Sequence, residues 1–403
     1  MADSLMALAE AREKLLAHAR VVTTSETVSL ASGYGRVLSS DMSAVLDVPH
    51  WDNSAMDGYA ARWGSGSRKL PVSQYLRAGA APLPLAPDTV ARVFTGASIP
   101  QGADLVVAQE EVVVLDDERI QLPDTAPLGQ HIRRRGEDMT RGDLLLGAGT
   151  RLKPADLGVL ASQGYAEVSV QRPLRIALLA SGDELVDPGS RELAVGEIYN
   201  SNSIMLGSLL RAWGCDLERI AVVRDDYCAT RRAIESAAAT ADLVISSGGA
   251  SVGEADVIKD AIEELGEIAL WRIAIKPGKP FVFGHACSTP FIGLPGNPAS
   301  AFVTLAILAR PFISALQGRS DGELRSLPVF ADFSLAQPAS RTEFVRVHLT
   351  MKDEALVARP LSNQSSGVMS ALSQADALAI VEQGDSVKPG SPLKAISLNQ
   401  LLW

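Results

Sequence analysis

Strand-like and helix-like segments alternate regularly between residues 173 and 320, and this alternation most constrains the fold. Apolar runs suited to buried strands occupy 175–180, 218–223 and 242–246, and segments with helical periodicity occupy 203–213, 230–241 and 255–265. Parallel strands need crossover connections of this length, which are usually helices. The pattern therefore predicts a doubly wound α/β domain built on a parallel sheet with right-handed crossovers.

The segments on either side indicate further domains, because 403 residues are too many for one ordinary core. Residues 51–140 hold short apolar runs between Gly and Pro turns, which predicts a β-rich inserted domain. Residues 1–50 and 141–172 flank this insert, and we expect them to form one discontinuous N-terminal or linker domain. The α/β domain then covers 173–324, and short alternating strands predict a small all-β domain over 325–403. The fold class is thus multidomain α/β plus β.

The composition argues against several classes of protein. Hydrophobic residues make up 47% of the chain and charged residues 21%, so most of the chain can bury a core. The formal charge of −10 argues against a nucleic-acid-binding protein, which would carry a basic face. The longest apolar run, Ala299–Ala309, stops at Arg310 and is too short to span a bilayer. The N-terminus lacks a signal-peptide pattern, so we expect neither nucleic acid nor membrane as a partner.

Cysteine and histidine usage indicates a cytoplasmic protein without a site for a soft metal. Cys215, Cys228 and Cys287 are odd in number and have no close pair, which is typical of reduced thiols. The five histidines are scattered without ligand spacing. Any bound metal should therefore be a hard cation held by carboxylates.

The turn at 246–256, SSGGASVGEAD, is expected to lead from a buried strand into a helix. Gly248 and Gly249 let the backbone approach an anion closely, and the N-terminus of the next helix adds its positive end. Ser251 supplies a hydroxyl, and Glu254 and Asp256 supply carboxylates. This combination suggests a metal-assisted reaction of a phosphate or another oxyanion.

Three further predicted strand ends carry unusual residues, at 181–185 (SGDEL), 224–226 (RDD) and 293–300 (GLPGNPAS). Ligands of an open parallel sheet bind at the carboxyl ends of its strands, so we expect all four segments to share one cleft. The acidic and hydroxyl groups that would face this cleft are Asp183, Glu184, Asp225, Asp226, Ser251 and Asp256. Lys276 and Lys279 of KPGKP can neutralise an anion there. Carboxylates and lysines together suit a phosphate ester or oxyanion bound with Mg²⁺.

Each segment alone also has a simpler interpretation. Asp and Gly are common in turns, and isolated lysines or an arginine run such as 133–135 are usually solvated. GASVG at 249–253 matches the G-x-S-x-G nucleophile elbow of α/β-hydrolases, with His285 or His348 as a conceivable base. The coincidence of four segments at strand ends favours a shared site. The double glycine followed by acids favours an anion cradle over a nucleophile.

Together, these segments resemble the molybdopterin molybdenumtransferase family, the bacterial relatives of the gephyrin E domain. The motifs are ordered along nearly the whole chain: DNSAMDGYA (52–60), FTGASIPQGADLVVAQEE (94–111), GEDMTRGD (136–143), ASGDEL, GEIYNSNS, SSGGASVGEAD, KPGKP and GLPGNPAS. The resemblance implies a central α/β domain like the molybdopterin-binding fold, a C-terminal β-barrel, and a homodimer whose cleft uses both subunits. It also implies a reaction in which adenylylated molybdopterin and molybdate give molybdenum cofactor and AMP, with Mg²⁺ or a similar cation. The upstream adenylyltransferase is a further expected partner.

The resemblance also implies the roles of individual residues. Five carboxylates would be catalytic: Asp57 and Asp138, reaching the cleft from the other subunit, and Glu184, Asp225 and Asp256, lining it from the α/β domain. Of these, Asp225 and Asp256 would hold the metal. The groups that would bind substrate or oxyanion are Ser181, Asn200, Gly248, Gly249, Ser251, Lys276, Lys279, Pro295, Asn297, Pro298 and Ser300.

One departure from the family pattern lies in IYNSN, where several relatives have Asp in place of Asn200. A neutral amide oxygen replaces a carboxylate there, so we assign Asn200 a binding role rather than a catalytic one. Two alternatives to a molybdenumtransferase remain open. One is a molybdopterin-binding scaffold or paralogue without insertase activity, and the other is a serine hydrolase.

Overall fold

The centre of the molecule is a six-stranded sheet with strand order β17-β14-β18-β22-β21-β19. The computed structural model describes residues 5–22, 24–64, 68–219, 222–248 and 257–402. The strands are β14 (Arg175–Ala180), β17 (Asp216–Arg219), β18 (Leu243–Ser247), β19 (Gly266–Trp271), β21 (Val282–Ala286) and β22 (Thr289–Leu294). The first four in spatial order run parallel, as predicted.

Helices cover both faces of this sheet. They are α3 (Ser201–Ala212), α4 (Tyr227–Thr240), α5 (Val257–Leu265), α6 (Pro298–Val303) and α7 (Arg310–Leu316), with the π-helix η3 (Thr304–Ala309) between the last two. Successive residues of β14 point to opposite faces. Ile176 packs in the cluster that includes residues of α3, α6 and α7, and Ala177 in the cluster that includes residues of α4 and α5. This two-sided packing confirms the doubly wound domain.

One edge of the sheet departs from the parallel arrangement. β21 runs antiparallel to both β22 and β19. β21 and β22 are joined by a two-residue turn in which Cys287 and Ser288 have φ angles of 48° and 71°. Positive φ at both central positions matches the twist of a tight hairpin, so no crossover helix is needed.

The apolar segment that follows β22 is longer than its sequence pattern indicates. The helical run Pro298–Leu316 has 19 residues and is apolar enough to cross a membrane by length and composition, but 89% of its most apolar stretch is buried inside the protein. The helical run continues past Arg310, whose side chain is buried and lies 5.9 Å from the ring centroid of Trp213. The run therefore packs as a core helix, together with α1 (Leu8–Ala17).

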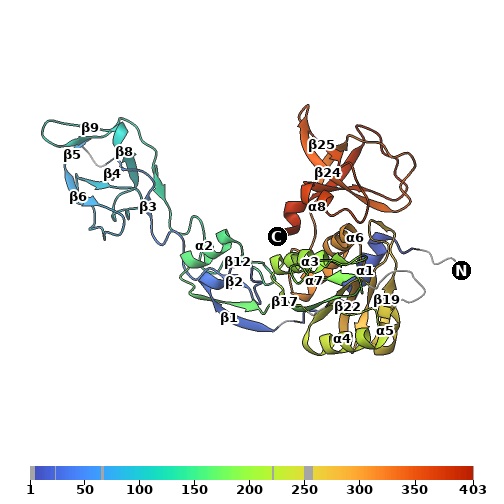
Figure 1. The fold of residues 1–403 in the computed structure, drawn as a ribbon. Coiled ribbons are helices and arrows are strands. Elements are labelled where there is room, and N and C mark those ends of the chain that lie inside the picture. Colours follow the sequence, from blue (N-terminus) through green and yellow to red (C-terminus); the bar gives the residue numbers. More distant parts are fainter. Residues whose placement is uncertain (1–4, 23, 65–67, 220–221, 249–256, 403) are drawn as a thin grey trace.

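The chain from β1 to β13 forms an elongated arm (Figure 1). Near the sheet lie the pairs β1 (Ser25–Ser29) with β13 (Glu167–Gln171) and β2 (Met42–Ser43) with β12 (Leu144–Leu146), next to α2 (Pro154–Ser162). The pair β3 (Asn53–Ser54) with β11 (Ile132–Arg133) leads to the far end. There, β4 (Gly58–Ala61), β6 (Val72–Leu76), β7 (Val90–Val93) and β8 (Leu105–Ala108) form one sheet, and β5 (Lys69–Leu70), β9 (Val113–Val114) and β10 (Ile120–Gln121) form another. The far end of the arm is thus built from β-sheets, which confirms the predicted β-rich inserted domain.

The C-terminal part forms a closed β-barrel, as expected. Its strands are β23 (Leu327–Ala331), β24 (Thr342–Lys352), β25 (Ala355–Pro360), β26 (Ala377–Val381) and β27 (Pro392–Ser397), and pairing between β24 and β26 closes the ring. The short strand β20 (Ile275–Lys276) of the preceding segment adds to β24. α8 (Ser370–Gln374) precedes β26, and η4 (Leu398–Leu402) ends the described chain.

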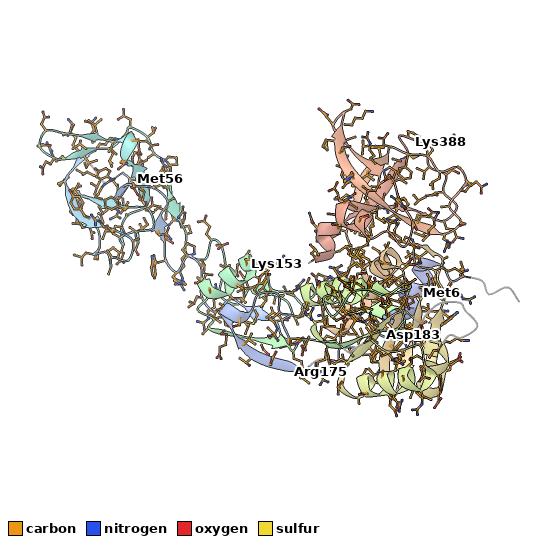
Figure 2. All side chains as sticks on the ribbon, viewed as in Figure 1. Met6, Met56, Lys153, Arg175, Asp183 and Lys388 are labelled. Carbon is orange, nitrogen blue, oxygen red and sulfur yellow. The ribbon has the colours of Figure 1, made fainter. Side chains whose placement is uncertain are left out.

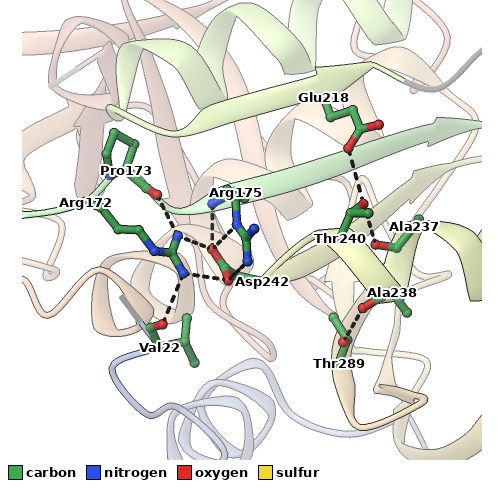
Figure 3. A network of polar contacts seen from close by, with 10 residues as sticks. All are labelled: Val22, Arg172, Pro173, Arg175, Glu218, Ala237, Ala238, Thr240, Asp242 and Thr289. Atoms are coloured by element: carbon green, nitrogen blue, oxygen red, sulfur yellow. Dashed lines mark hydrogen bonds and ion pairs between the residues drawn. The ribbon is translucent and has the colours of Figure 1, made fainter. Parts of the chain in front are cut away.

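A carboxylate connects the arm to the sheet (Figure 3). Asp242, just before β18, accepts hydrogen bonds from Arg172, at 2.7 and 2.9 Å, and from Arg175. Burial by itself would raise the pKa of Asp242, but the hydrogen bonds from the two arginines outweigh it and lower the pKa to about 2. Because Arg172 follows β13 and Arg175 begins β14, this cluster fixes the junction between the two parts.

Candidate functional site

A cavity of about 560 Å³ opens at the carboxyl ends of β14, β18 and β22. These strands are neighbours in the parallel part of the sheet, and Val223, just before the RDD segment, forms a bridge with Ser181 beside them. The cavity is lined by Ser181, Gly182, Glu184, Leu185, Ile198, Tyr199, Asn200, Ser201, Asn202, Asp225, Ser247, Gly248, Pro280, Pro295, Gly296, Asn297, Pro298, Ser300 and Gly367. The four strand ends singled out in the sequence thus contribute to one cavity.

Ser181 and Asp225 form the acidic wall of the cavity. The Ser181 hydroxyl donates a 2.7 Å hydrogen bond to Asp225 Oδ1, and the Asp225 backbone N–H donates to Asp183 Oδ1 at 3.3 Å. Glu184 lines the same wall and is exposed. Gly182 has a φ of +154°, a backbone conformation that residues with a side chain rarely adopt, and a Cβ there would displace the flexible end of Glu184. The arrangement presents two carboxylates toward one space and holds one of them with a hydroxyl.

The double-glycine turn is described only up to its first glycine. Gly248 has a φ of +92°, and a Cβ there would lie 2.4 Å from the Ser181 carbonyl oxygen. Two strand-end turns can approach this closely only without a side chain. Gly249, Ser251 and Asp256 lie outside the described residues, as does Glu254.

Two asparagines of the IYNSNS segment shape the cavity floor. Asn200 is buried, and its Oδ1 accepts from the Ser203 backbone N–H at 3.2 Å, which makes it the N-cap of α3. Asn202 Nδ2 donates to Ser247 Oγ at 3.0 Å and to the Gly296 carbonyl at 2.7 Å. Sequence reasoning missed Asn202, although its position beside Asn200 at a predicted helix start was a usable signal.

Each of these asparagines has one unused polar atom. Within the described part of the chain, Asn200 Nδ2 and Asn202 Oδ1 are buried and have no hydrogen-bond partner. A buried polar group without a partner costs roughly 1–3 kcal/mol. Both residues line the cavity.

The PGNP segment and the barrel close the opposite wall. Pro295, Pro298 and Ser300 line the cavity. Asn297 Nδ2 donates to Ser366 Oγ at 3.1 Å, which links the segment to the loop that carries Gly367. The C-terminal barrel domain therefore contributes to the cavity as well.

The two lysines of KPGKP do not line this cavity. Lys276 Nζ lies 3.0 Å from Glu343 Oε1 and borders a different cavity of about 440 Å³ beside the barrel. Lys279 is exposed, next to the lining residue Pro280. The described cavity wall is thus acidic and polar rather than basic.

Asp57 and Asp138 lie outside the cavity of their own chain. Asp57 Oδ1 accepts from the backbone and the hydroxyl of Thr95, at 2.7 and 2.8 Å, and these hydrogen bonds hold its pKa below the usual range. Asp138 is exposed in the loop between β11 and β12. Figure 2 shows Met56, the neighbour of Asp57, on the far arm, well away from Asp183.

The described residues contain no group of three or more His, Cys, Asp or Glu side chains placed to hold a metal ion. Glu184 and Asp225 are the described carboxylates that line the cavity. Mg²⁺ is commonly bound by one or two carboxylates, with substrate phosphates and waters as the other ligands. This pair fits that mode.

The cavity geometry also bears on the hydrolase alternative. His285 lies on β21, and His348 lies on β24 with its Nδ1 3.3 Å from Asp376 Oδ2. Neither histidine is among the lining residues, so the described wall of the cavity offers no imidazole base. A Ser-His arrangement of the hydrolase type has no support here.

Comparisons with known proteins agree with this architecture. Residues 6–164 match the MoeA N-terminal region (domain I and II), residues 177–315 match a probable molybdopterin binding domain, and residues 329–398 match the MoeA C-terminal region (domain IV). A molybdopterin biosynthesis MoeA protein from Pyrococcus horikoshii has a similar structure, with a TM-score of 0.79 and 29% identity over 98% of this chain and 99% of that chain.

Curated relatives show the same similarity along their full length. The molybdopterin molybdenumtransferase of Haemophilus influenzae is 36% identical over 407 residues, which cover 99% of this chain and all of that protein. The molybdopterin molybdenumtransferase of Synechococcus elongatus is 35% identical over 414 residues, which cover 98% of this chain and all of that protein. The resemblance seen in the sequence motifs is confirmed, and the chain belongs to the molybdopterin molybdenumtransferase (MoeA) family.

Proposed function

We propose that this enzyme of molybdenum cofactor biosynthesis inserts molybdenum from molybdate into adenylylated molybdopterin and releases AMP and molybdenum cofactor. The observation that carries the proposal is the convergence of four strand ends on one cavity with two carboxylates. A cavity of about 560 Å³ falls within the range of roughly 300–1,000 Å³ that small-molecule sites occupy. Because the chain belongs to the molybdopterin molybdenumtransferase family, a pterin nucleotide is the proposed occupant of this cavity.

The polar groups of the cavity suit the two oxyanions of this reaction. Ser300 and the buried amide of Asn200 can donate to phosphate or molybdate oxygens. Lys276 and Lys279 are proposed to supply positive charge at the cavity rim, which requires Lys276 to leave Glu343. Gly248, Gly249 and Ser251 would add backbone and hydroxyl donors at the same strand end.

The carboxylates are proposed to bind a cation and to orient the reacting groups. Mg²⁺ or a similar cation, held by Asp225 and Asp256, would neutralise the phosphate as the bond to AMP breaks. The hydroxyl of Ser181 keeps Asp225 in place, and Glu184 lies beside it in the wall. Asp57 and Asp138 would come from the second subunit of a homodimer. The upstream adenylyltransferase is the proposed supplier of the substrate.

Release of AMP separates this proposal from the alternative of a molybdopterin-binding scaffold. Purified protein is mixed with adenylylated molybdopterin, molybdate and Mg²⁺, and AMP is quantified by chromatography. We expect AMP release with all three present and a large decrease when a chelator removes Mg²⁺. Tight binding of the substrate without AMP release would support the scaffold instead.

A further inference from the structure

A third cavity, of about 260 Å³, lies between the end of α1 and the β21–β22 hairpin. It shares no lining residue with the candidate active site. Its polar lining comes from His18, Arg20, His285 and Ser288. We propose that His18 and His285 bind a divalent transition-metal ion in this cavity, of the class that imidazole prefers, such as Zn²⁺ or Ni²⁺.

The spacing of the two imidazoles fits a shared metal ion. The ring centroids of His18 and His285 lie 5.6 Å apart, and the ring planes are tilted by 48°. Two imidazoles on one tetrahedral Zn²⁺, with Zn–N distances of about 2.0–2.1 Å, have centroids roughly 5 Å apart. The observed centroid separation of 5.6 Å is close to this value.

Glu267 provides the carboxylate that usually supports a ligating histidine. Its Oε1 lies 3.5 Å from His285 Nδ1, from the neighbouring strand β19. The Nδ1 atom is buried and makes no closer hydrogen bond among the described residues. Ligating histidines generally direct one ring nitrogen toward a carboxylate, which fixes the tautomer and leaves the other nitrogen free for the metal.

The local charges also favour a cation over a second anion site. Burial, and next the neighbouring His18, lower the pKa of His285. His18 is the C-cap of α1, where the helix dipole places partial negative charge. Arg20 is the positive group of the lining, and it is exposed and can turn toward solvent.

Metal binding would clamp the N-terminal helix to the hairpin. α1 and β21 are far apart in the sequence, which is why ligand spacing along the chain gives no sign of this pair. Two protein ligands leave coordination positions for the Ser288 hydroxyl or for water. The site is thus expected to be an open, moderate-affinity site.

Titration calorimetry with Ni²⁺ tests the proposal on the full-length protein without an affinity tag. Excess Mg²⁺ in the buffer occupies sites made of hard oxygen ligands. We expect the wild type to bind one Ni²⁺ per chain. His18→Gln and His285→Gln should each lower the affinity for Ni²⁺ by at least about tenfold, and Glu267→Gln should lower it by roughly 10- to 100-fold. Absence of a one-to-one binding event, or unchanged affinity in both histidine variants, would overturn the proposal.

Two control variants make the result specific. His348→Gln removes a half-exposed histidine on the barrel and should leave Ni²⁺ affinity unchanged. Cys287→Ser removes the exposed thiol of the hairpin turn and should also leave it unchanged. Loss of binding in either control, with binding retained in the His18 variant, would contradict the proposed ligand pair. Thermal unfolding without metal should be the same in His18→Gln as in the wild type, which excludes misfolding.

Discussion

Asn200 shows how one residue can serve both the fold and the site. Its Oδ1 caps α3, its Nδ2 is a buried donor without a partner among the described residues, and the residue lines the cavity. Removing an N-cap side chain costs about 0.5–2 kcal/mol, whereas Ser caps a helix as well as Asn does and adds no charge. Asn200→Ala should therefore lower the free energy of unfolding of the α/β domain by about 1 kcal/mol in urea denaturation, and Asn200→Ser should lower it less. Equal stability of all three proteins would show that the cap contributes nothing.

At the same scale, the sequence could predict which segments meet but not how single side chains pair. Asp and Gly at strand ends identified Glu184, Asp225 and Gly248 as neighbours, and all three line the cavity. The bridge that Asn202 makes between Ser247 and Gly296 depends on a helix start lying between two strand ends. Such a contact follows from tertiary packing, and no spacing along the chain encodes it.

At the scale of secondary-structure elements, Asp242 joins β13, β14 and β18 through Arg172 and Arg175 (Figure 3). The pKa of Asp242 is about 2 in the folded protein, below its ordinary value of 3.8, so its stabilising contribution is present above about pH 4 and is lost as the pH falls toward 2. Asp242→Asn should lower the free energy of unfolding by about 1–2 kcal/mol at pH 7, and the difference from the wild type should shrink at pH 3. Thermal unfolding at both pH values measures this.

Asp332 offers a matched control for this ion pair. It lies 2.9 Å from Arg359, and both side chains are exposed, so solvent screens the interaction. Asp332→Asn should change the free energy of unfolding by less than about 0.5 kcal/mol at either pH. A loss as large as that of Asp242→Asn, or a loss for Asp242→Asn that does not depend on pH, would contradict the role of the buried cluster.

The elements themselves were largely predictable. Periodicity of apolar residues located β14, β18 and α3 to within a few residues. It could not show that β21 returns antiparallel, because both directions bury the same apolar residues, and the turn at Cys287 and Ser288 carries no Asn or Gly to mark a tight hairpin. The length of the Pro298–Leu316 helix was also missed, since a buried arginine looks like a surface residue in a sequence.

At the scale of the whole molecule, the long arm makes the proposed homodimer testable. Asp57 does not line the cavity of its own chain, and its neighbour Met56 lies on the far arm, away from Asp183 (Figure 2), so a catalytic Asp57 must act on the cavity of the partner. Asp57→Asn and Glu184→Gln should each be inactive alone. Mixed subunits should regain roughly a quarter of wild-type activity, because half of the random dimers are mixed and each of these has one site free of both changes.

Mass spectrometry of the intact mixture verifies that mixed dimers form. No recovery of AMP release in the presence of mixed dimers would show that Asp57 does not act across the subunits. The domain boundaries at residues 50, 140, 172 and 324 remain a prediction, since apolar patterning marks the elements within a domain more clearly than the joints between domains. Limited proteolysis would locate those joints.

The central claim is that the cavity at the strand ends performs the AMP-releasing reaction, and two neighbouring carboxylates test it most directly. Asp225 lines the cavity, whereas Asp226 caps α4 and does not line it. Asn is as good an N-cap as Asp, so Asp226→Asn keeps the fold. In a single-turnover assay of AMP release, we predict a decrease of at least about 100-fold for Asp225→Asn, and a rate near that of the wild type for Asp226→Asn. Equal rates in the two folded variants would contradict the assignment of the site.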